Sequence, residues 1–168
     1  MVNTDQLSDT LPDRIKSARR VAIVGIGDEL IFPDRLGMYA AREMGEQNLH
    51  GVSIFLAGTV PESITGPLRR YGPGHVLFLD AADMGARPGT IAAIGQERIP
   101  ASQISTHVRP LSVVMDYIEK ETGAGVTLLG IQPDLTGTDK DLSEEDLAYL
   151  DRNLQVLSQI LRNRQDKQ

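Results

Sequence analysis

The chain has no cysteine among its 168 residues. This absence excludes disulfide bonds, thiolate metal ligands and a cysteine nucleophile, and it agrees with a reducing compartment. The polar segment 1–20 lacks the apolar core of a secretory signal. No apolar run approaches the roughly 18 residues that a membrane span needs. We therefore expect a cytoplasmic protein without membrane insertion.

An excess of basic residues is also missing, since the formal net charge is -6. A nucleic-acid surface requires clustered Lys and Arg, so we expect no nucleic-acid partner. Hydrophobic residues make up 40% of the chain. A chain of this length can bury about two thirds of its unfolded surface in one domain.

Short apolar runs alternate with amphipathic segments along the chain. Strands are expected at 21–24, 52–58, 75–80 and 125–131, with a short edge strand at 90–94. Helices are expected at 35–47, 62–71, 110–121 and after residue 143. This alternation predicts an α/β fold: one domain with a twisted, mostly parallel sheet of about five strands, flanked by helices on both faces.

The two ends of the chain carry the clearest helical patterns. Ser143 and Asp146 form a capping-box arrangement ahead of leucines spaced by three and four residues, which favours a helix lying on the sheet over a coiled-coil seam. Residues 21–168 are expected to form the α/β domain. Residues 1–20 are expected to form an N-terminal arm or a short amphipathic helix.

The segment 25–37, GIGDELIFPDRLG, follows the first expected strand but does not fit a dinucleotide-binding loop. The fingerprint needs a third glycine where this chain has Leu30, and no Walker-type Gly-Lys-Ser/Thr follows. The segment instead carries acidic residues on a long loop. Asp34 could cap the following helix, because Asp after Pro is common at a helix start, or it could be a ligand.

Two further residues favour a metal site. Asp80 ends the expected strand HVLFLD, where a buried carboxylate needs turn amides or a cation as its partner. His107 precedes the expected helix at 110–121, whereas His50 and His75 lie beside strand starts and are expected to be structural. Asp34, Asp80 and His107 would meet at the carboxyl edge of the sheet. Two carboxylates and one imidazole suit zinc, nickel or a similar ion, with coordination positions left open.

Four separated motifs, in the same order, resemble the hydrogenase maturation endopeptidases, in particular the proteases of the hydrogenase 3 (formate hydrogenlyase) large subunit. The motifs are GIGDELIFPDRLG at 25–37, FLDAADMGARPGTI at 78–91, STHVRPLSVVMDYI at 105–118 and LLGIQPDLTG at 128–137. The resemblance covers the chain from about Val21 to its end.

The resemblance implies an α/β fold and removal of the C-terminal extension of a [NiFe]-hydrogenase large-subunit precursor after nickel insertion. It assigns the three metal-contacting positions to Asp34, Asp80 and His107, which would grip nickel carried by the substrate; zinc or cadmium could occupy the same site. Asp34 or Asp80 would act as the catalytic base on water, giving an aspartic-type or metal-dependent endopeptidase. We expect a monomer.

Two positions depart from the family pattern: Asp28 replaces the usual Asn, and Pro33 stands where Asp is frequent. We expect Asp28 to add negative charge and change a loop hydrogen bond, while Pro33 removes no ligand. These departures keep a second hypothesis open, a docking or nickel-chaperone protein that binds the precursor without cutting it. A flavodoxin-like nucleotide switch is the third. Because imidazole coordinates only when neutral, activity should fall below about pH 6.5.

Overall fold

A five-stranded sheet forms the centre of the computed structural model, which describes residues 2–95 and 108–164. The strands are β1 (Val21–Ile26), β2 (Val52–Gly58), β3 (His75–Ala81), β4 (Ile91–Ile94) and β5 (Gly125–Ile131). Their order is β2-β1-β3-β5-β4; the first four are parallel, and β4 pairs antiparallel with β5 at one edge. Every expected strand is present, and the mostly parallel sheet is confirmed.

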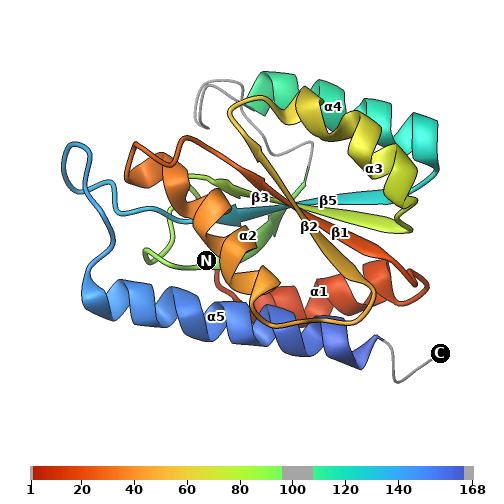
Figure 1. Cartoon of the computed structure of the whole chain (residues 1–168). Coiled ribbons are helices and arrows are strands. Elements are labelled where there is room, and N and C mark those ends of the chain that lie inside the picture. Colours follow the sequence, from red (N-terminus) through yellow and green to blue (C-terminus); the bar gives the residue numbers. More distant parts are fainter. Residues whose placement is uncertain (1, 96–107, 165–168) are drawn as a thin grey trace.

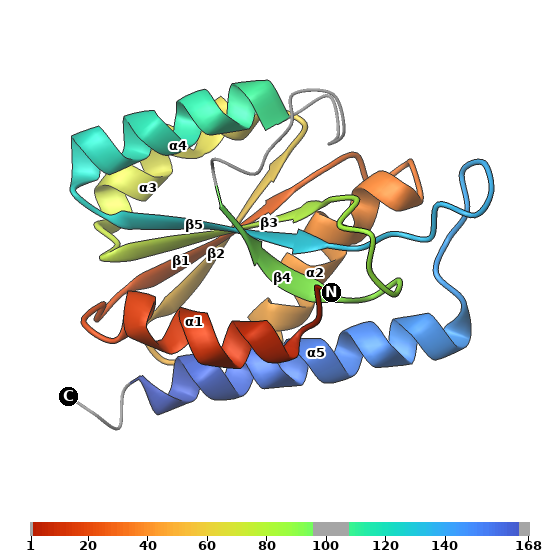
Figure 2. The same cartoon turned by 180° about the vertical axis from the view of Figure 1, so that it is seen from behind.

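Helices cover both faces of this sheet (Figure 1, and from behind in Figure 2). One face carries α3 (Thr65–Tyr71) and α4 (Val108–Thr122), and the other carries α1 (Asp5–Ile15), α2 (Leu36–Gly45) and α5 (Glu144–Asn163). Two 3-10 turns, η1 (Pro33–Arg35) and η2 (Pro61–Ile64), precede α2 and α3. Within the described ranges, no helix combines the length and hydropathy needed to cross a bilayer.

The central strand β1 shows why the sheet needs helices on both sides. All of its residues are buried. Val21 and Ile23 join the core beneath α1, α2 and α5, while Ala22 and Val24 join the core beneath α3 and α4. A parallel strand covered on both faces is therefore a continuous apolar run, without the polar alternation of a half-exposed strand.

Both terminal helices pack into one of these cores. In α5, the Ser143 hydroxyl accepts a hydrogen bond from the Asp146 amide at 3.1 Å, as the capping pattern predicts. In α1, Leu7, Leu11 and Ile15 are fully buried in the same cluster as the leucines of α5. Of the two alternatives for the N-terminal segment, the structure has the amphipathic helix.

His75, at the start of β3, is a structural residue, as expected. Its ring is buried, and Nε2 lies 2.8 Å from the Thr127 hydroxyl oxygen of β5. Gly125 makes room for the ring, because a Cβ there would lie 2.5 Å from Nδ1. Burial, together with the nearby Arg14 charge, lowers the pKa of His75 to about 4.

This lowered pKa predicts that the fold weakens in mild acid. Between the ordinary His value of about 6.5 and the folded value of about 4, the unfolded chain binds the proton that folded His75 excludes. We expect the His75 contribution to the free energy of unfolding to fall by roughly 2–3 kcal/mol from pH 7 to pH 4. Urea titrations across this range should show the slope, and His75→Gln should flatten it; an unchanged slope would contradict the assignment.

Candidate active site

The carboxyl ends of β1, β3 and β5 meet at one edge of the sheet, on the left in Figure 1. The loop after β1 leads into η1, which contacts β3. In open parallel sheets this edge is where ligands bind. The predicted site residues that the structure describes, Asp34 and Asp80, both lie here.

Asp34 is held by the loop that follows β1. Gly27 has φ 129°, and a Cβ at this position would collide with the Asp34 carbonyl oxygen. The Asp34 carboxylate atom Oδ2 accepts a hydrogen bond from the Asp28 amide at 2.9 Å. Asp34 is not the N-cap residue of α2, which is Arg35. The helix-cap alternative is therefore wrong, and the carboxylate is anchored to its own loop.

Asp28 forms a local turn of the same loop. Its Oδ1 atom accepts a hydrogen bond from the Leu30 amide at 2.9 Å. An asparagine oxygen could accept the same bond. Either Asp or the usual Asn at position 28 can therefore form this turn. Pro33 stands at the first position of η1, where its missing N–H costs nothing.

Asp80 stands one residue before the end of β3, in register with Gly130 of β5, and its residue exposure is only 1%. Several amides of the following turn have other acceptors. The amide of Ala82 donates to the Ile131 carbonyl, and the amide of Met84 donates to Gln132 Oε1. These two turn amides thus have other acceptors than Asp80, for which we expected either turn amides or a cation as the partner.

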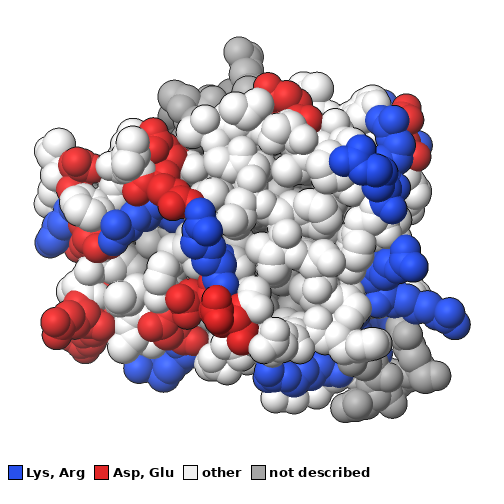
Figure 3. Space-filling view, in the orientation of Figure 1, with Lys and Arg blue, Asp and Glu red and all other residues white. Residues whose placement is uncertain are grey.

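A pocket of about 200 Å³ opens at this edge. Residues from all three loops line it: Pro33, Asp34, Ala81, Ala82, Asp83, Pro133 and Leu135. Its lining includes two carboxylates and no basic side chain. On the visible face, Asp and Glu side chains gather toward this end among some Lys and Arg, whereas Lys and Arg predominate at the opposite end (Figure 3). The two carboxylates of the pocket would attract a cation.

Gln132, directly after β5, organises the turn that follows Asp80. Its Oε1 accepts hydrogen bonds from Met84 N at 2.6 Å and Ala86 N at 3.3 Å, and its Nε2 donates to Asp83 Oδ1 at 3.3 Å. Neither Gln132 nor Asp83 was predicted from the sequence. The signal that identified Asp80, a polar residue at the end of a buried strand, also applies to Gln132.

Loss of the Gln132 acceptor should loosen this turn. In Gln132→Leu, two part-buried amides lose their partner, so we expect the free energy of unfolding to fall by about 1–3 kcal/mol. Gln132→Glu keeps the acceptor for these two amides, but it sets a carboxylate against Asp83 and should also lower the stability. Urea unfolding measures the stability, and hydrogen exchange at the Met84 and Ala86 amides should be faster only in the Leu variant. Equal exchange in both variants would refute the assigned role.

The loop after β5 is held by a second carboxylate. Asp134 accepts hydrogen bonds from the Thr136 hydroxyl at 2.6 Å and the Thr136 amide at 2.9 Å, and it lies 3.3 Å from Lys140 Nζ. These bonds from Thr136, aided by Lys140, lower the pKa of Asp134. The turn holds Leu135, which is 51% exposed, at the mouth of the pocket.

His107, the third predicted ligand, lies outside the described residues. Among residues 2–95 and 108–164, no group of three His, Cys, Asp or Glu side chains could hold a metal ion. The structure therefore brings Asp34 and the end of β3 to one edge of the sheet, while the complete ligand set stays a prediction.

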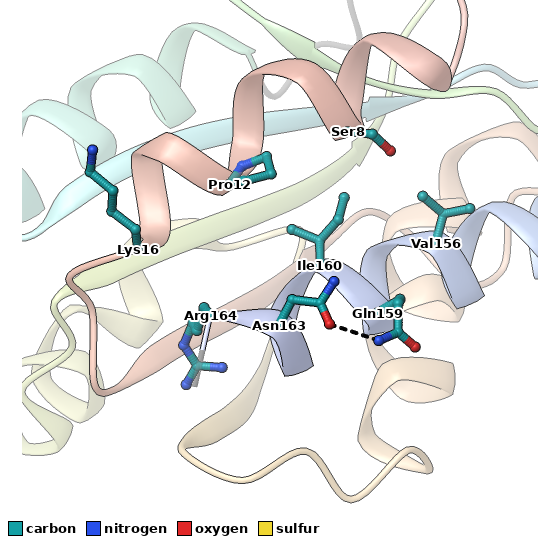
Figure 4. A pocket seen from close by; sticks show the side chains of 8 residues that line it. All are labelled: Ser8, Pro12, Lys16, Val156, Gln159, Ile160, Asn163 and Arg164. Carbon is teal, nitrogen blue, oxygen red and sulfur yellow. Dashed lines mark hydrogen bonds between the residues drawn. The ribbon is translucent and has the colours of Figure 1, made fainter. Parts of the chain in front are cut away.

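A larger groove of about 550 Å³ lies between α1 and α5 (Figure 4). No carboxylate or imidazole is among the residues that line it: Ser8, Pro12, Lys16, Val156, Gln159, Ile160, Asn163 and Arg164. The Arg164 guanidinium already donates to backbone carbonyls, including those of Ala18 at 3.0 Å and Gly51 at 3.1 Å. Arg164 thus has a structural role, and the groove offers no carboxylate or imidazole for catalysis. The smaller acidic pocket is therefore the better candidate site.

Comparison with known proteins identifies the family to which the chain is similar. A family model described as hydrogenase maturation protease (HycI) matches residues 38–160. Over 135 residues, 76% of this chain, the sequence is 33% identical to a protein of Methanocaldococcus jannaschii named as a hydrogenase maturation protease, of which the match covers 80%. It is 30% identical over 113 residues to the hydrogenase 3 maturation protease of Escherichia coli K12, covering 67% of this chain and 72% of that protein.

Solved structures show the same fold. The crystal structure of the [NiFe] hydrogenase maturation protease HycI from Thermococcus kodakarensis aligns with a TM-score of 0.76 and 30% sequence identity. The alignment covers 90% of this chain and 98% of that one. Asp80 lies inside the range matched by the family model, and Asp34 lies just before it.

Proposed function

Because this chain belongs to the hydrogenase maturation protease family, we propose that it removes the C-terminal extension of a [NiFe]-hydrogenase large-subunit precursor after nickel has been inserted. The observation that carries the proposal is the acidic pocket where Asp34 and the end of β3 meet. The reaction is placed in the cytoplasm, with the protease acting as a monomer.

Nickel is a part of the substrate in this proposal. Asp34 supplies a carboxylate that is anchored to its loop, Asp80 supplies a second from the end of β3, and His107 completes the set. Carboxylate oxygens and an imidazole nitrogen are suitable donors for a divalent ion that already has ligands in the precursor. Nickel would thus mark a precursor that is ready for processing, and its binding would position the scissile peptide bond. Zinc or cadmium could serve as substitutes.

Water is the nucleophile in the proposed chemistry, because the chain has no cysteine and no evident Ser–His–Asp arrangement. Asp34 or Asp80 takes the proton of the water as its oxygen attacks the scissile carbonyl carbon. The proton then passes to the leaving amine as the C–N bond breaks. This role as general base makes the enzyme an aspartic-type peptidase.

Intact mass measurement of the precursor tests the proposal. The nickel-loaded precursor should lose its C-terminal extension when the protein is added, whereas the nickel-free precursor should keep its full mass. Cleavage of both forms would contradict nickel recognition. Binding of the nickel-loaded precursor without any change in its mass would favour the docking or chaperone alternative.

A further inference from the structure

The outer edge of β2 is open. β2 ends the sheet order and pairs only with β1 among the described strands. The Val21 amide donates a hydrogen bond to the Gly51 carbonyl at 2.9 Å. This bond fixes which residues of β2 point their backbone N–H and C=O groups toward β1. Because these groups alternate along a strand, Ser53 and Phe55 direct their backbone groups to β1, and Ile54 and Leu56 direct theirs away from it.

From Val52 to Leu56 this edge lacks the charges, prolines and bulges that usually protect an edge strand; the register to β1 shifts only beyond Leu56. The sequence VSIFLAG contains no charge and no proline. Leu56 is 40% exposed, and Val60, just beyond the strand, is 46% exposed. In Figure 3 the surface over β2, which lies nearest the viewer in Figure 1, is a band without charged side chains. An uncharged, unprotected edge of this kind is a template for another strand.

The strand also leads to the candidate active site. At its end, the Gly58 carbonyl accepts a hydrogen bond from the Gly27 amide at 2.8 Å. Gly27 in turn packs against the backbone of Asp34. A chain paired with β2 would therefore run toward the loop that carries the anchored carboxylate.

We infer that β2 receives an extended segment of the polypeptide substrate as a sixth strand, an inference that rests on the proposed function. The strand of seven residues spans about 23 Å. Backbone pairing would hold a segment of varied sequence, and the uncharged side chains would accept an apolar or neutral one. A second copy of this chain is a poorer occupant, because so short an edge offers little of the roughly 1,200 Å² that a stable dimer buries.

Proline at Leu56 tests the inference, because it removes the outward amide and leaves the ladder to β1 in place. Leu56→Ala is the matched control, since it shortens the side chain but keeps the amide. With nickel-loaded precursor we expect Leu56→Pro to raise KM about tenfold and to change kcat little, while Leu56→Ala stays within about twofold of wild type. Thermal melting shows whether the proline variant is folded; Leu56→Lys, which adds a repelling edge charge, replaces it if it is not.

Hydrogen exchange on the full-length protein supplies a second readout. Added precursor should slow exchange at the Ile54 and Leu56 amides of wild type. If wild type cuts the precursor but neither slowed exchange nor a KM change appears, the inference is overturned while the proposed function stands. If the amides are protected without cleavage, the docking edge stands and the proposed function fails. Protection that depends on protein concentration without precursor, with dimers in sedimentation, would assign the edge to a second copy and overturn the inference.

Discussion

Replacement of Asp80 by asparagine is expected to lower kcat/KM for the nickel-loaded precursor by at least about 100-fold. Asparagine has nearly the same shape but supplies neither an anionic ligand nor a general base. Asparagine also keeps the volume of this buried side chain, so we expect the variant to stay folded. Initial rates of precursor shortening, read by mass, together with urea unfolding, measure both effects.

Asp34→Asn should cause a loss of similar size, because it also removes an anionic ligand and a possible general base. The asparagine oxygen can still accept the hydrogen bond from Asp28 N, so the loop should keep its conformation. Asp13→Asn is the matched control: Asp13 is an exposed residue of α1, and its loose contact with Lys16 at 3.8 Å contributes little. Normal cleavage by both site variants would show that neither carboxylate serves the reaction. Loss of cleavage in the control would point to a general effect of charge.

Gly37→Ala should destabilise the fold, against the ordinary trend for helices. Alanine normally stabilises a helix interior by about 1 kcal/mol over glycine. Gly37, however, lies in the first turn of α2, where a Cβ would collide with the carbonyl oxygens of Ile26 and Leu79. We expect a loss of about 3 kcal/mol in the free energy of unfolding, because these oxygens belong to the sheet and cannot move aside.

The same substitution should also impair cleavage, because Asp34 precedes Gly37 by one turn and would shift with the helix. Gly45→Ala, at the other end of α2, is the matched control. Its Cβ would meet only Ile54 Cγ1, at 3.4 Å, so the variant should be as stable as wild type or slightly more stable. Denaturant unfolding of the two variants compares them directly; equal stabilities would show that the close approach at Gly37 is unimportant.

The pattern of buried and amphipathic segments was sufficient to predict the strands. Residues such as Val21 and Ile23 alternate between two cores, and only a strand covered on both sides is apolar throughout. The strand order was not predicted, because pairing partners depend on packing between distant segments. The N-terminal helix was only one of two alternatives, since its burial depends on contact with α5, more than a hundred residues away.

The candidate site, too, could be predicted only in part. Asp80 could be found from its place at a strand end, because the carboxyl edge of a parallel sheet is where sites form. The anchoring of Asp34 could not, because it depends on the positive φ of Gly27 and on a hydrogen bond within the loop. The role of Gln132 links two loops that are far apart in sequence, so it became visible only in three dimensions.

Anomalous diffraction at the zinc edge, from crystals of the protein soaked with zinc at neutral pH, tests the central claim most directly. The account predicts one strong peak at the carboxyl edge of the sheet, about 2.0–2.2 Å from carboxylate oxygens of both Asp34 and Asp80 and about 2.0–2.1 Å from a ring nitrogen of His107. A peak bound by other residues, or no peak near these two carboxylates, would contradict it.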